Sequence, residues 1–297
     1  MPGAIKKRVG VAGMGIMGSR MAQNLLEKGF PTSVWNRTEA RCRPLAEKGA
    51  RIASSPRDLG ESADVVITCV ADPNALGRVV FAADGVLNAA RPGFRLMDCS
   101  TVSPGLSRRI AAAFRERGAD ALEAPVTGSK NGAEKGTLLL MTGGAREVHD
   151  ELMPIMMAIG TKAIYCGETG AGSTVKLIGN TMISFMLEGL CESLVLARKA
   201  GVSGEKVLEV IQASGFASGY YDFKGKAILA RDFDTHFSLD LLHKDQTLMI
   251  EEAAALGVTM PGLAALREVL QAARGQGYGQ EDIAAAVKVL ERNAGLE

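Results

Sequence analysis

Three glycines near the start of the chain have the spacing of a turn that binds the phosphates of a dinucleotide. Gly13, Gly15 and Gly18 follow an apolar strand pattern at 8–12 and precede a helical pattern from 16 to about 28. In such a turn the first glycine permits the tight bend, the second lets the backbone approach a pyrophosphate, and the third lets the helix pack against the strand. The helix N-terminus then faces the phosphates. The predicted contacts come from Gly13, Met14, Gly15, Ile16, Met17 and Gly18.

The residues after the next strand pattern, at 31–35, indicate which dinucleotide binds. A site for NAD usually has a carboxylate here, which accepts hydrogen bonds from the ribose and would repel the 2′-phosphate of NADP. This chain has neutral Asn36, then Arg37, whose guanidinium offers a phosphate a planar set of donors, then the hydroxyl of Thr38. The pattern favours NADP. The alternative is that Arg37 is a solvated charge and Thr38 caps the following helix.

A lysine and an asparagine farther along the chain have a spacing that suits acid–base chemistry. Lys176 and Asn180 are four residues apart, so they project from one face of a helix. If that helix begins at about residue 173, Lys176 lies in its first turn, where the helix dipole makes a cation unfavourable and eases loss of its proton. A lysine of this kind can act as a general acid or base. A surface lysine whose stem covers apolar neighbours fits the spacing equally well.

The elements that must position these residues alternate regularly up to about residue 165. Short β-rich runs interleaved with helical patterns are typical of a mostly parallel sheet with helices on both faces. The expected strands are 8–12, 31–35, 64–70, 94–98, 119–123, 137–142 and 162–165, with amphipathic helices at 39–48, 105–117 and 146–159. Beyond them, helices are expected at 204–214, 221–230, 238–256, 261–274 and 280–293. We predict an α/β fold in which a Rossmann-type doubly wound sheet domain (1–166) binds NADP. An all-α domain (167–297) for substrate and assembly follows, and it begins with a long helix at about 173–199.

The long helix is apolar on most of its faces, so it must be buried. If the helical domain cannot cover Ile178, Met182, Phe185 and Leu190 by itself, a second subunit does so. We therefore expect a homodimer or a homotetramer.

The composition is that of an ordinary globular protein. The 297 residues are 47% hydrophobic and 23% charged, with a net charge of +1, which leaves no electrostatic footprint for nucleic acid or an anionic membrane. Five scattered cysteines without a C-x-x-C pair are typical of free thiols in a reducing cytoplasm, and Cys99 has no basic partner that would make it a nucleophile.

The sequence predicts neither a signal peptide nor a membrane span nor a metal site. The apolar run after Lys6-Lys7-Arg8 is interrupted by glycines, unlike the apolar region of a signal peptide. The apolar stretch 177–187 is too short to span a bilayer, and three histidines without metal-ligand spacing predict no metal.

Five motifs follow one another along almost the whole chain. Besides the glycine-rich turn, they are Asp98-Cys-Ser100-Thr101, Ala124-Pro-Val-Thr127-Gly128-Ser129, Lys176 with Asn180, and Lys244-Asp245. Together they resemble the β-hydroxyacid dehydrogenase family, which includes 3-hydroxyisobutyrate dehydrogenase, tartronate semialdehyde reductase and the glyoxylate/succinic semialdehyde reductases.

The resemblance implies a role for each of these positions. Lys176 is implied to be the catalytic acid–base and Asn180 to orient the substrate. The substrate carboxylate is implied to bind Thr127, Gly128 and Ser129, with Ser100 beside Asp98 on the pocket floor. The implied cofactor contacts outside the glycine turn are Asn36, Arg37, Thr38, Val70, Ala71, Asp72, Thr101 and Lys244.

Within the family, this chain resembles the glyoxylate/succinic semialdehyde reductase branch. It departs from that branch at Thr127 (usually serine), at Gly132 (usually proline) and in the aromatic stretch 216–223. The resemblance implies an NADPH-dependent reductase or dehydrogenase that interconverts a small carboxylate-bearing aldehyde and its hydroxy acid by hydride transfer, with a lysine as general acid. Glyoxylate and succinic semialdehyde are the expected substrate types. The alternatives are a 3-hydroxyisobutyrate or tartronate semialdehyde enzyme, an imine reductase, and a non-catalytic NADP-binding protein.

Overall fold

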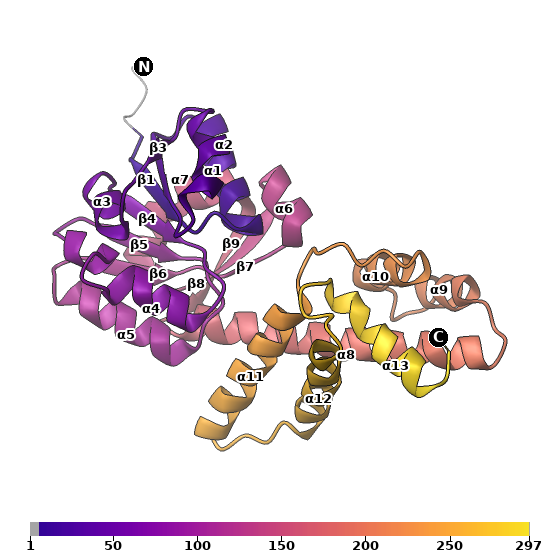
Figure 1. The fold of residues 1–297 in the computed structure, drawn as a ribbon. Helices are drawn as coiled ribbons and strands as arrows, with labels where there is room; N and C mark the ends of the chain where they lie inside the picture. Colours follow the sequence, from indigo (N-terminus) through magenta and orange to yellow (C-terminus); the bar gives the residue numbers. More distant parts are fainter. Residues whose placement is uncertain (1–5, 297) are drawn as a thin grey trace. The chain divides into compact units, whose positions relative to one another are not determined.

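The computed structural model describes residues 6–296. The chain divides between Lys176 and Leu177 into two compact units, and each is described by itself. Figure 1 shows the sheet in the first unit and the helices of the second.

The first unit is built on one twisted, mostly parallel sheet. Its strand order is β3-β2-β1-β4-β5-β6-β8-β7, with β9 paired to β8. Strands β1 to β6 are parallel, and β8 is antiparallel to β6 and β7. The strands are β1 Val9–Ala12, β2 Thr32–Trp35, β3 Arg51–Ile52, β4 Val65–Thr68, β5 Arg95–Asp98, β6 Asp120–Glu123, β7 Val126–Thr127, β8 Leu138–Gly143 and β9 Gly160–Gly167. The predicted Rossmann-type sheet is confirmed, although the two-residue strands β3 and β7 were not predicted because they are too short to show a periodicity.

Helices cover both faces of this sheet (Figure 1). The core on one face includes Met21 of α1 and Leu152 of α7, and the core on the other includes Leu76 of α4 and Phe114 of α5. The helices are α1 Ile16–Glu27, α2 Arg43–Ala46, α3 Pro56–Glu61, α4 Pro73–Phe81, α5 Pro104–Arg115, α6 Ser129–Lys135 and α7 Arg146–Ile159, with 3₁₀ turns η1 Glu39–Cys42 and η2 Val86–Ala89. The helix expected at 39–48 is instead η1 followed by the single turn of α2. Pro44 lies in the first turn of α2, where its missing N–H costs no helical hydrogen bond.

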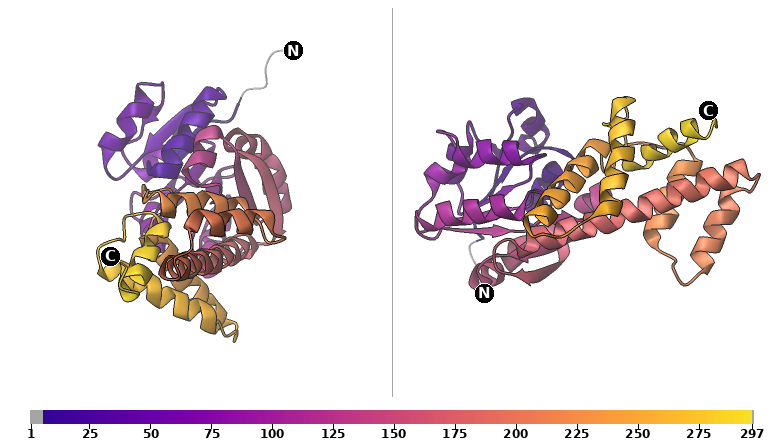
Figure 2. Two further views of the ribbon diagram at one scale, coloured as in Figure 1. Left: turned by 90° about the vertical axis from the view of Figure 1, so that its right-hand side faces the viewer. Right: turned by 90° about the horizontal axis from the view of Figure 1, so that it is seen from below.

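The second unit is all-helical among its described residues. Figure 2 shows α8 Ala171–Lys199 as one long helix, which runs from the first unit into the second. The other helices of the second unit are α9 Gly204–Ala213, α10 Gly219–Leu229, α11 Leu239–Ala255, α12 Pro261–Gly275, η3 Ile283–Ala286 and α13 Val287–Asn293. Leu187, Leu194 and Leu242 meet Val287 in the core. The helix expected at 280–293 begins only at residue 283, because the Asp282 side chain caps η3.

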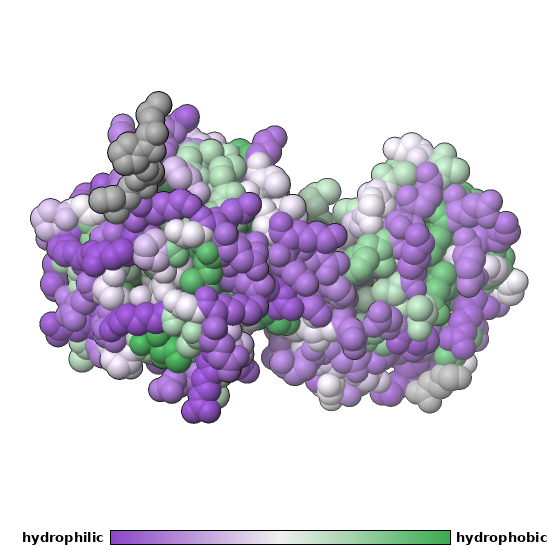
Figure 3. Space-filling model, turned by 90° about the horizontal axis from the view of Figure 1, so that it is seen from above, coloured by the Kyte–Doolittle hydropathy of each residue, from purple (hydrophilic) through white to green (hydrophobic). Residues whose placement is uncertain are grey.

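Helix α8 is, among the described residues, the one helix long and apolar enough to cross a membrane. The apolar stretch 177–187 was expected to be too short to span a bilayer, and this expectation is wrong because the stretch is part of a helix that meets the length and composition criteria. Half of its most apolar window is buried inside the protein, and the core helix of a globular protein meets the same criteria. The molecular face in Figure 3 is mostly hydrophilic, with hydrophobic groups in small separate areas.

Glu188 on α8 is a buried carboxyl group, 7% exposed, without a hydrogen bond or an ion pair among the described residues. Burial, and secondly the charge of Glu192, raises the pKa of Glu188 to about 7. Because the folded state then holds the proton more tightly, the free energy of unfolding is highest below the ordinary pKa and falls as the pH rises through about 7.

Glu188→Gln is therefore expected to raise the free energy of unfolding at pH 8 by about 1–2 kcal/mol, allowing for partial screening by solvent, and to change it little at pH 4. Urea unfolding at both pH values measures this. Glu192→Gln, which removes only the smaller cause, is the control with a smaller expected gain. An equal effect of Glu188→Gln at the two pH values would contradict the assignment.

Candidate functional site

The glycine-rich turn has the geometry of a phosphate cradle. Gly13 has φ +105°, and a Cβ there would lie 2.2 Å from the carbonyl oxygen of Cys69. A Cβ on Gly18 would lie 1.9 Å from the carbonyl oxygen of Gly13. Both positions therefore require glycine. By contrast, apart from the chain neighbours of Gly15, no atom of the described residues lies within 4 Å of where its Cβ would be, and no side chain among them caps α1. This open helix N-terminus fits the phosphates of a dinucleotide.

Asn36 holds this turn against the end of β2. The N–H of Met14 donates to Asn36 Oδ1 over 3.0 Å, and Asn36 Nδ2 donates to the carbonyl of Thr38 over 2.9 Å. The amide of Asn36 is thus used at both ends within the protein. The sequence indicates only that a neutral residue stands where an NAD site usually has a carboxylate, and the structure adds that Asn36 positions the turn.

Arg37 and Thr38 lie on the surface directly after this contact. Arg37 makes no ion pair with any residue in the range 6–296, so its guanidinium has no protein carboxylate to neutralise it. Thr38 occupies the N-cap position of η1, but its side chain makes no capping hydrogen bond. The alternative interpretation is therefore confirmed for the N-cap position of Thr38, although the threonine side chain does not cap the helix.

Hydrogen bonds tie the ends of β4 and β5 together near the turn. Asp98 accepts from Thr68 Oγ1 at 2.7 Å and from the N–H of Ser100 at 3.0 Å, while the N–H of Val70 donates to Ser100 Oγ at 3.0 Å. Burial raises the pKa of Asp98 to about 6, although the Thr68 and Ser100 hydrogen bonds oppose the shift. Asp98 and Ser100 thus fix the strand ends that carry the loop Val70–Asp72.

Three other predicted residues have a structural feature of their own. The carboxylate of Asp72 caps α4 by accepting from the N–H of Ala75 at 2.8 Å. Gly128 and Ser129, between β7 and α6, have φ +134° and +54°. A serine in the left-handed region stores about 1 kcal/mol of strain, and such residues concentrate at ligand-binding turns. Ala71, Thr101 and Thr127 are partly or fully exposed in the same unit.

The start of α8 is fixed by Glu123, a residue that is not part of the predicted site motifs. Its buried carboxylate accepts from the N–H groups of Gly170 and Gly172 at 2.7 and 2.8 Å and from Ser173 Oγ at 2.6 Å. A Cβ on Gly172 would lie 2.6 Å from the carbonyl oxygen of Met141, so the glycine is required by this close packing. Glu123 therefore supplies a negative charge at the helix N-terminus, where it is favourable. Its position directly before the predicted motif at 124–129 was the signal that could have found it.

Lys176 is buried rather than at the surface. It is 9% exposed and lies one turn before Asn180, which is 3% exposed. The alternative of a surface lysine is therefore wrong. Because α8 begins at Ala171 and not at about 173, Lys176 lies in the second turn. The expectation that the helix dipole eases loss of the Lys176 proton is therefore also wrong, since the effect of the dipole falls off within the first turn.

Asp245 on α11 joins Asn180 to Lys244. Asn180 Nδ2 donates to Asp245 Oδ2 at 2.6 Å, and Lys244 Nζ lies 2.9 Å from Asp245 Oδ1. Asp245 is 3% exposed. In the sequence Asp245 stands out only as the neighbour of Lys244, whereas in the structure it is the group that fixes the Asn180 amide.

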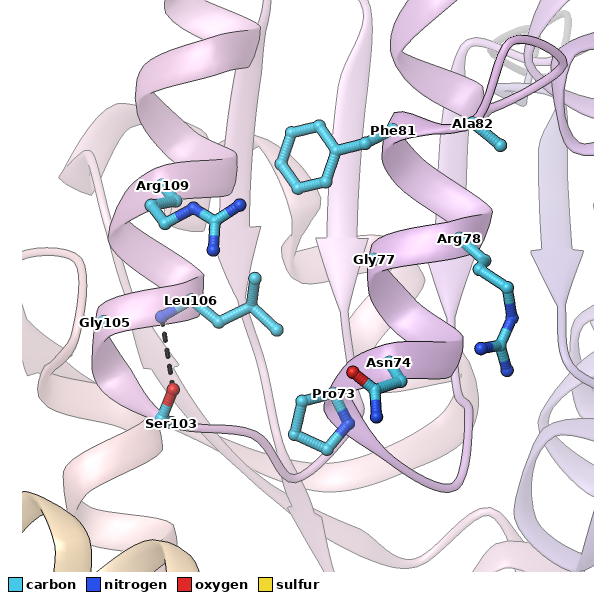
Figure 4. A pocket seen from close by; sticks show the side chains of 10 residues that line it. All are labelled: Pro73, Asn74, Gly77, Arg78, Phe81, Ala82, Ser103, Gly105, Leu106 and Arg109. Atoms are coloured by element: carbon cyan, nitrogen blue, oxygen red, sulfur yellow. Dashed lines mark hydrogen bonds between the residues drawn. The ribbon is translucent and has the colours of Figure 1, made fainter.

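A groove between α4 and α5 lies in the first unit, with a volume of about 770 Å³. Phe81 and Arg109 point into it (Figure 4), and the guanidinium carbon lies 5.7 Å from the ring centroid. None of the predicted site residues is among the described residues that line it. Within residues 6–296, no group of three or more histidine, cysteine or acidic side chains could hold a metal ion.

An open glycine cradle on a Rossmann-type sheet, followed by a helical unit, defines a dinucleotide-dependent oxidoreductase. Residues 8–167 match the NAD-binding domain of 6-phosphogluconate dehydrogenase, and residues 170–290 match the NAD-binding domain of NADP-dependent 3-hydroxyisobutyrate dehydrogenase. The chain belongs to the family of 3-hydroxyisobutyrate dehydrogenase and the related β-hydroxyacid dehydrogenases, which act on CH–OH groups with NAD(P).

Similar proteins cover nearly the whole chain. Glyoxylate/succinic semialdehyde reductase 1 of Arabidopsis thaliana is 34% identical over 95% of this chain and 98% of its own. The 2-(hydroxymethyl)glutarate dehydrogenase of Eubacterium barkeri is 32% identical over 97% and 96% of the two chains. A solved structure of Psf3 in complex with NADP+ and 2-OPP has a TM-score of 0.87 and 26% identity, over 95% of this chain and 99% of that one.

Proposed function

We propose that this protein is an NADPH-dependent reductase or dehydrogenase that interconverts a small aldehyde acid and its hydroxy acid. The observation that carries the proposal is buried Lys176, one helical turn before an asparagine whose amide is fixed by Asp245. A lysine is expensive to bury, so a buried lysine on the helix that follows a dinucleotide domain has a functional explanation. The proposed substrate types are glyoxylate and succinic semialdehyde.

The dinucleotide would be held by the cradle at residues 13–18, with its 2′-phosphate at Arg37 and Thr38. Both side chains are exposed, and Arg37 is without a protein counter-ion among the described residues. The open space beside Gly15 supports binding of the pyrophosphate. Proposed further contacts come from the loop at 70–72 and from Thr101 and Lys244. NADP is therefore the proposed cofactor.

In the proposed reaction the cofactor, when bound, supplies a hydride to the carbonyl carbon. Lys176 donates a proton to the carbonyl oxygen as negative charge develops on it, and accepts that proton in the reverse direction. Asn180 orients the oxygen or the lysine, and because Asp245 holds the amide, its orientation is set before the substrate binds. The turn at Thr127, Gly128 and Ser129, with Ser100 below it, holds the substrate carboxylate.

A substrate panel tests the function. We expect two- to five-carbon aldehyde and keto acids to support NADPH oxidation, with kcat/KM at least about tenfold higher than for matched uncharged aldehydes, because one charged hydrogen bond is lost in the latter. Absorbance of NADPH measures the rates. If uncharged aldehydes are as good as the acids, the proposed carboxylate site is wrong.

The same panel separates the other functions. Turnover that requires an added amine would identify an imine reductase, and NADPH binding without turnover of any compound would identify a non-catalytic protein. A preference for the semialdehydes of branched or hydroxylated acids would move the substrate to the 3-hydroxyisobutyrate or tartronate type. One methylene in an apolar pocket changes selectivity by only about 1–3 kcal/mol, so the panel must include close pairs.

We also propose a homodimer or homotetramer. On α8, Ile178, Met182 and Phe185 are 51%, 59% and 45% exposed, and they recur at helical spacing on one face. Leu190, expected in the same role, is instead 2% exposed in the core of its own unit. An apolar stripe of this kind is expected to be covered by a second copy.

Light scattering at micromolar concentration is expected to give a mass of at least two chains. Met182→Glu, in the middle of the stripe, should shift the protein toward the monomer, whereas Val210→Glu on exposed α9 should not. A single-chain mass for the unmodified protein would contradict the assembly.

A further inference from the structure

Asn24, in the third turn of α1, is a buried polar side chain that the proposed mechanism does not use. It is 8% exposed and lies on the helix that begins directly after the dinucleotide cradle. Asparagine lowers the stability of a helix interior, because its short amide competes with the backbone for hydrogen bonds. A residue that is unfavourable within α1 indicates a contact outside it.

That contact is with α6, the short helix that follows the proposed carboxylate turn. Asn24 Nδ2 donates to the carbonyl of Ala133 at 2.7 Å, and to the carbonyl of Arg20 in its own helix at 2.9 Å. Ala133 lies in the last turn of α6, where a backbone carbonyl has no partner within the helix. The amide of Asn24 therefore caps the end of α6 from a different helix.

The residue after α6 also fits the Asn24 amide closely. Gly136 has φ +63°, and a Cβ there would lie 3.1 Å from Asn24 Oδ1. The left-handed backbone and the close approach both favour glycine. Arg20 adds a weaker contact, since its Nε lies 3.7 Å from the exposed carboxylate of Glu134. Two residues on one face of α1 thus contact the last turn of α6, and Asn24 is the buried one.

The other end of α6 carries a turn that needs such support. Gly128 and Ser129 have φ +134° and +54°, and a strained turn keeps its shape only where the surrounding structure holds it. Helix α6 has seven residues, too few to be stable by itself in water. Ala133 packs in the core, but apolar contacts are not directional, whereas the hydrogen bond from Asn24 fixes where α6 lies along α1.

We propose that Asn24 is a positioning residue, which fixes α6 so that the turn at 127–129 can bind the substrate carboxylate. A small aldehyde acid has few bonds between its carboxylate and its carbonyl carbon, so the carboxylate site must lie at a set distance from the cofactor. Because α1 begins at the dinucleotide cradle, one helix sets both positions. The proposal rests on the proposed function, since it takes the turn at 127–129 as the carboxylate site.

Replacement of Asn24 by leucine, which is branched at the same carbon and has no polar side-chain atom, tests this role. For the best aldehyde acid of the substrate panel, KM should rise about ten- to a hundredfold, the effect of losing one charge-assisted hydrogen bond to the carboxylate. Little change is expected in kcat, because this binding is lost alike in the ground state and the transition state. The Kd for NADPH and kcat/KM for the matched uncharged aldehyde should not change. Gln23→Ala is the control on the same helix, since the Gln23 amide bonds the exposed side chains of Glu27 and Lys48.

Gly136→Ala disturbs the same contact from the side of α6, and it keeps the proposal testable if Asn24→Leu does not fold. Its Cβ would press on Asn24 Oδ1, so KM for the acid should rise about tenfold. Gly118→Ala is the matched control. Gly118 has a similar φ of +69°, but a Cβ there would make an ordinary contact, 3.5 Å from Pro92 Cγ. This variant carries the same backbone strain and should have the KM of the unmodified protein.

Three results would overturn the proposal. They are a normal KM for the acid in folded Asn24→Leu, an equal loss of kcat/KM with the acid and with the uncharged aldehyde, and the same KM in Gly136→Ala as in Gly118→Ala. Failure of the proposed function has a different signature, because the unmodified protein itself would then not prefer acids to uncharged aldehydes. In that case the turn at 127–129 is not a carboxylate site, and the positioning role of Asn24 is overturned with it.

Discussion

Replacement of Lys176 by methionine is expected to lower kcat for reduction of an aldehyde acid by about a hundredfold or more, which is the usual contribution of a positioned general acid. Methionine retains the apolar stem of the buried side chain, so it removes the ammonium group without opening a large cavity. Because the dinucleotide cradle at residues 13–18 is built by a different part of the chain, the Kd for NADPH should not change. Steady-state kinetics and NADPH fluorescence titration measure the two quantities.

Lys199→Met is the matched control, since this lysine lies at the other end of the same helix and is exposed. It should have normal kcat. A loss of kcat and of NADPH binding together in Lys176→Met would indicate disturbed folding of α8 and not the loss of an acid. Near-normal kcat in Lys176→Met would remove this lysine from the proposed mechanism.

The parts of the site that are local in sequence could be predicted from it. The glycine turn is defined by six consecutive residues and by the strand and helix on either side, and the structure has the tight bend at Gly13 and the close packing at Gly18. The long, apolar α8 was equally evident from its composition. The sheet followed from short apolar runs between helical patterns, and only the two-residue strands β3 and β7 were below the length at which a period can be recognised.

Features that depend on long-range contacts could not be predicted. The first residue of α8 is determined by Glu123, almost fifty positions earlier in the chain, and this contact moves Lys176 into the second turn. The hydrogen bond between Asn180 and Asp245 likewise joins residues on different helices. Exposure also depends on tertiary packing: Leu190 and Met182 are both hydrophobic and lie on the same helix, yet one is in the core and the other is 59% exposed.

Loss of the Arg37 guanidinium is expected to weaken binding of NADPH by about ten- to a hundredfold, because charge-assisted hydrogen bonds to the 2′-phosphate contribute about 1.5–3 kcal/mol. NADH has no 2′-phosphate, so its affinity should barely change in Arg37→Ala. In the proposed site Asn36 has a positioning role, since its amide is hydrogen-bonded to Met14 and Thr38 and fixes the backbone on either side of Arg37 at the end of β2.

Fluorescence titration with both dinucleotides measures the selectivity, with Arg41→Ala as the control because this exposed arginine lies four residues farther along, in η1. Arg41→Ala should retain the affinities of the unmodified protein for NADPH and NADH. If Arg37→Ala weakens both dinucleotides by the same factor, the arginine contacts a part that they share and not the 2′-phosphate. Equal kcat/KM of the unmodified protein with NADPH and NADH would show that the absence of an acid at position 36 and the presence of Arg37 do not select NADP.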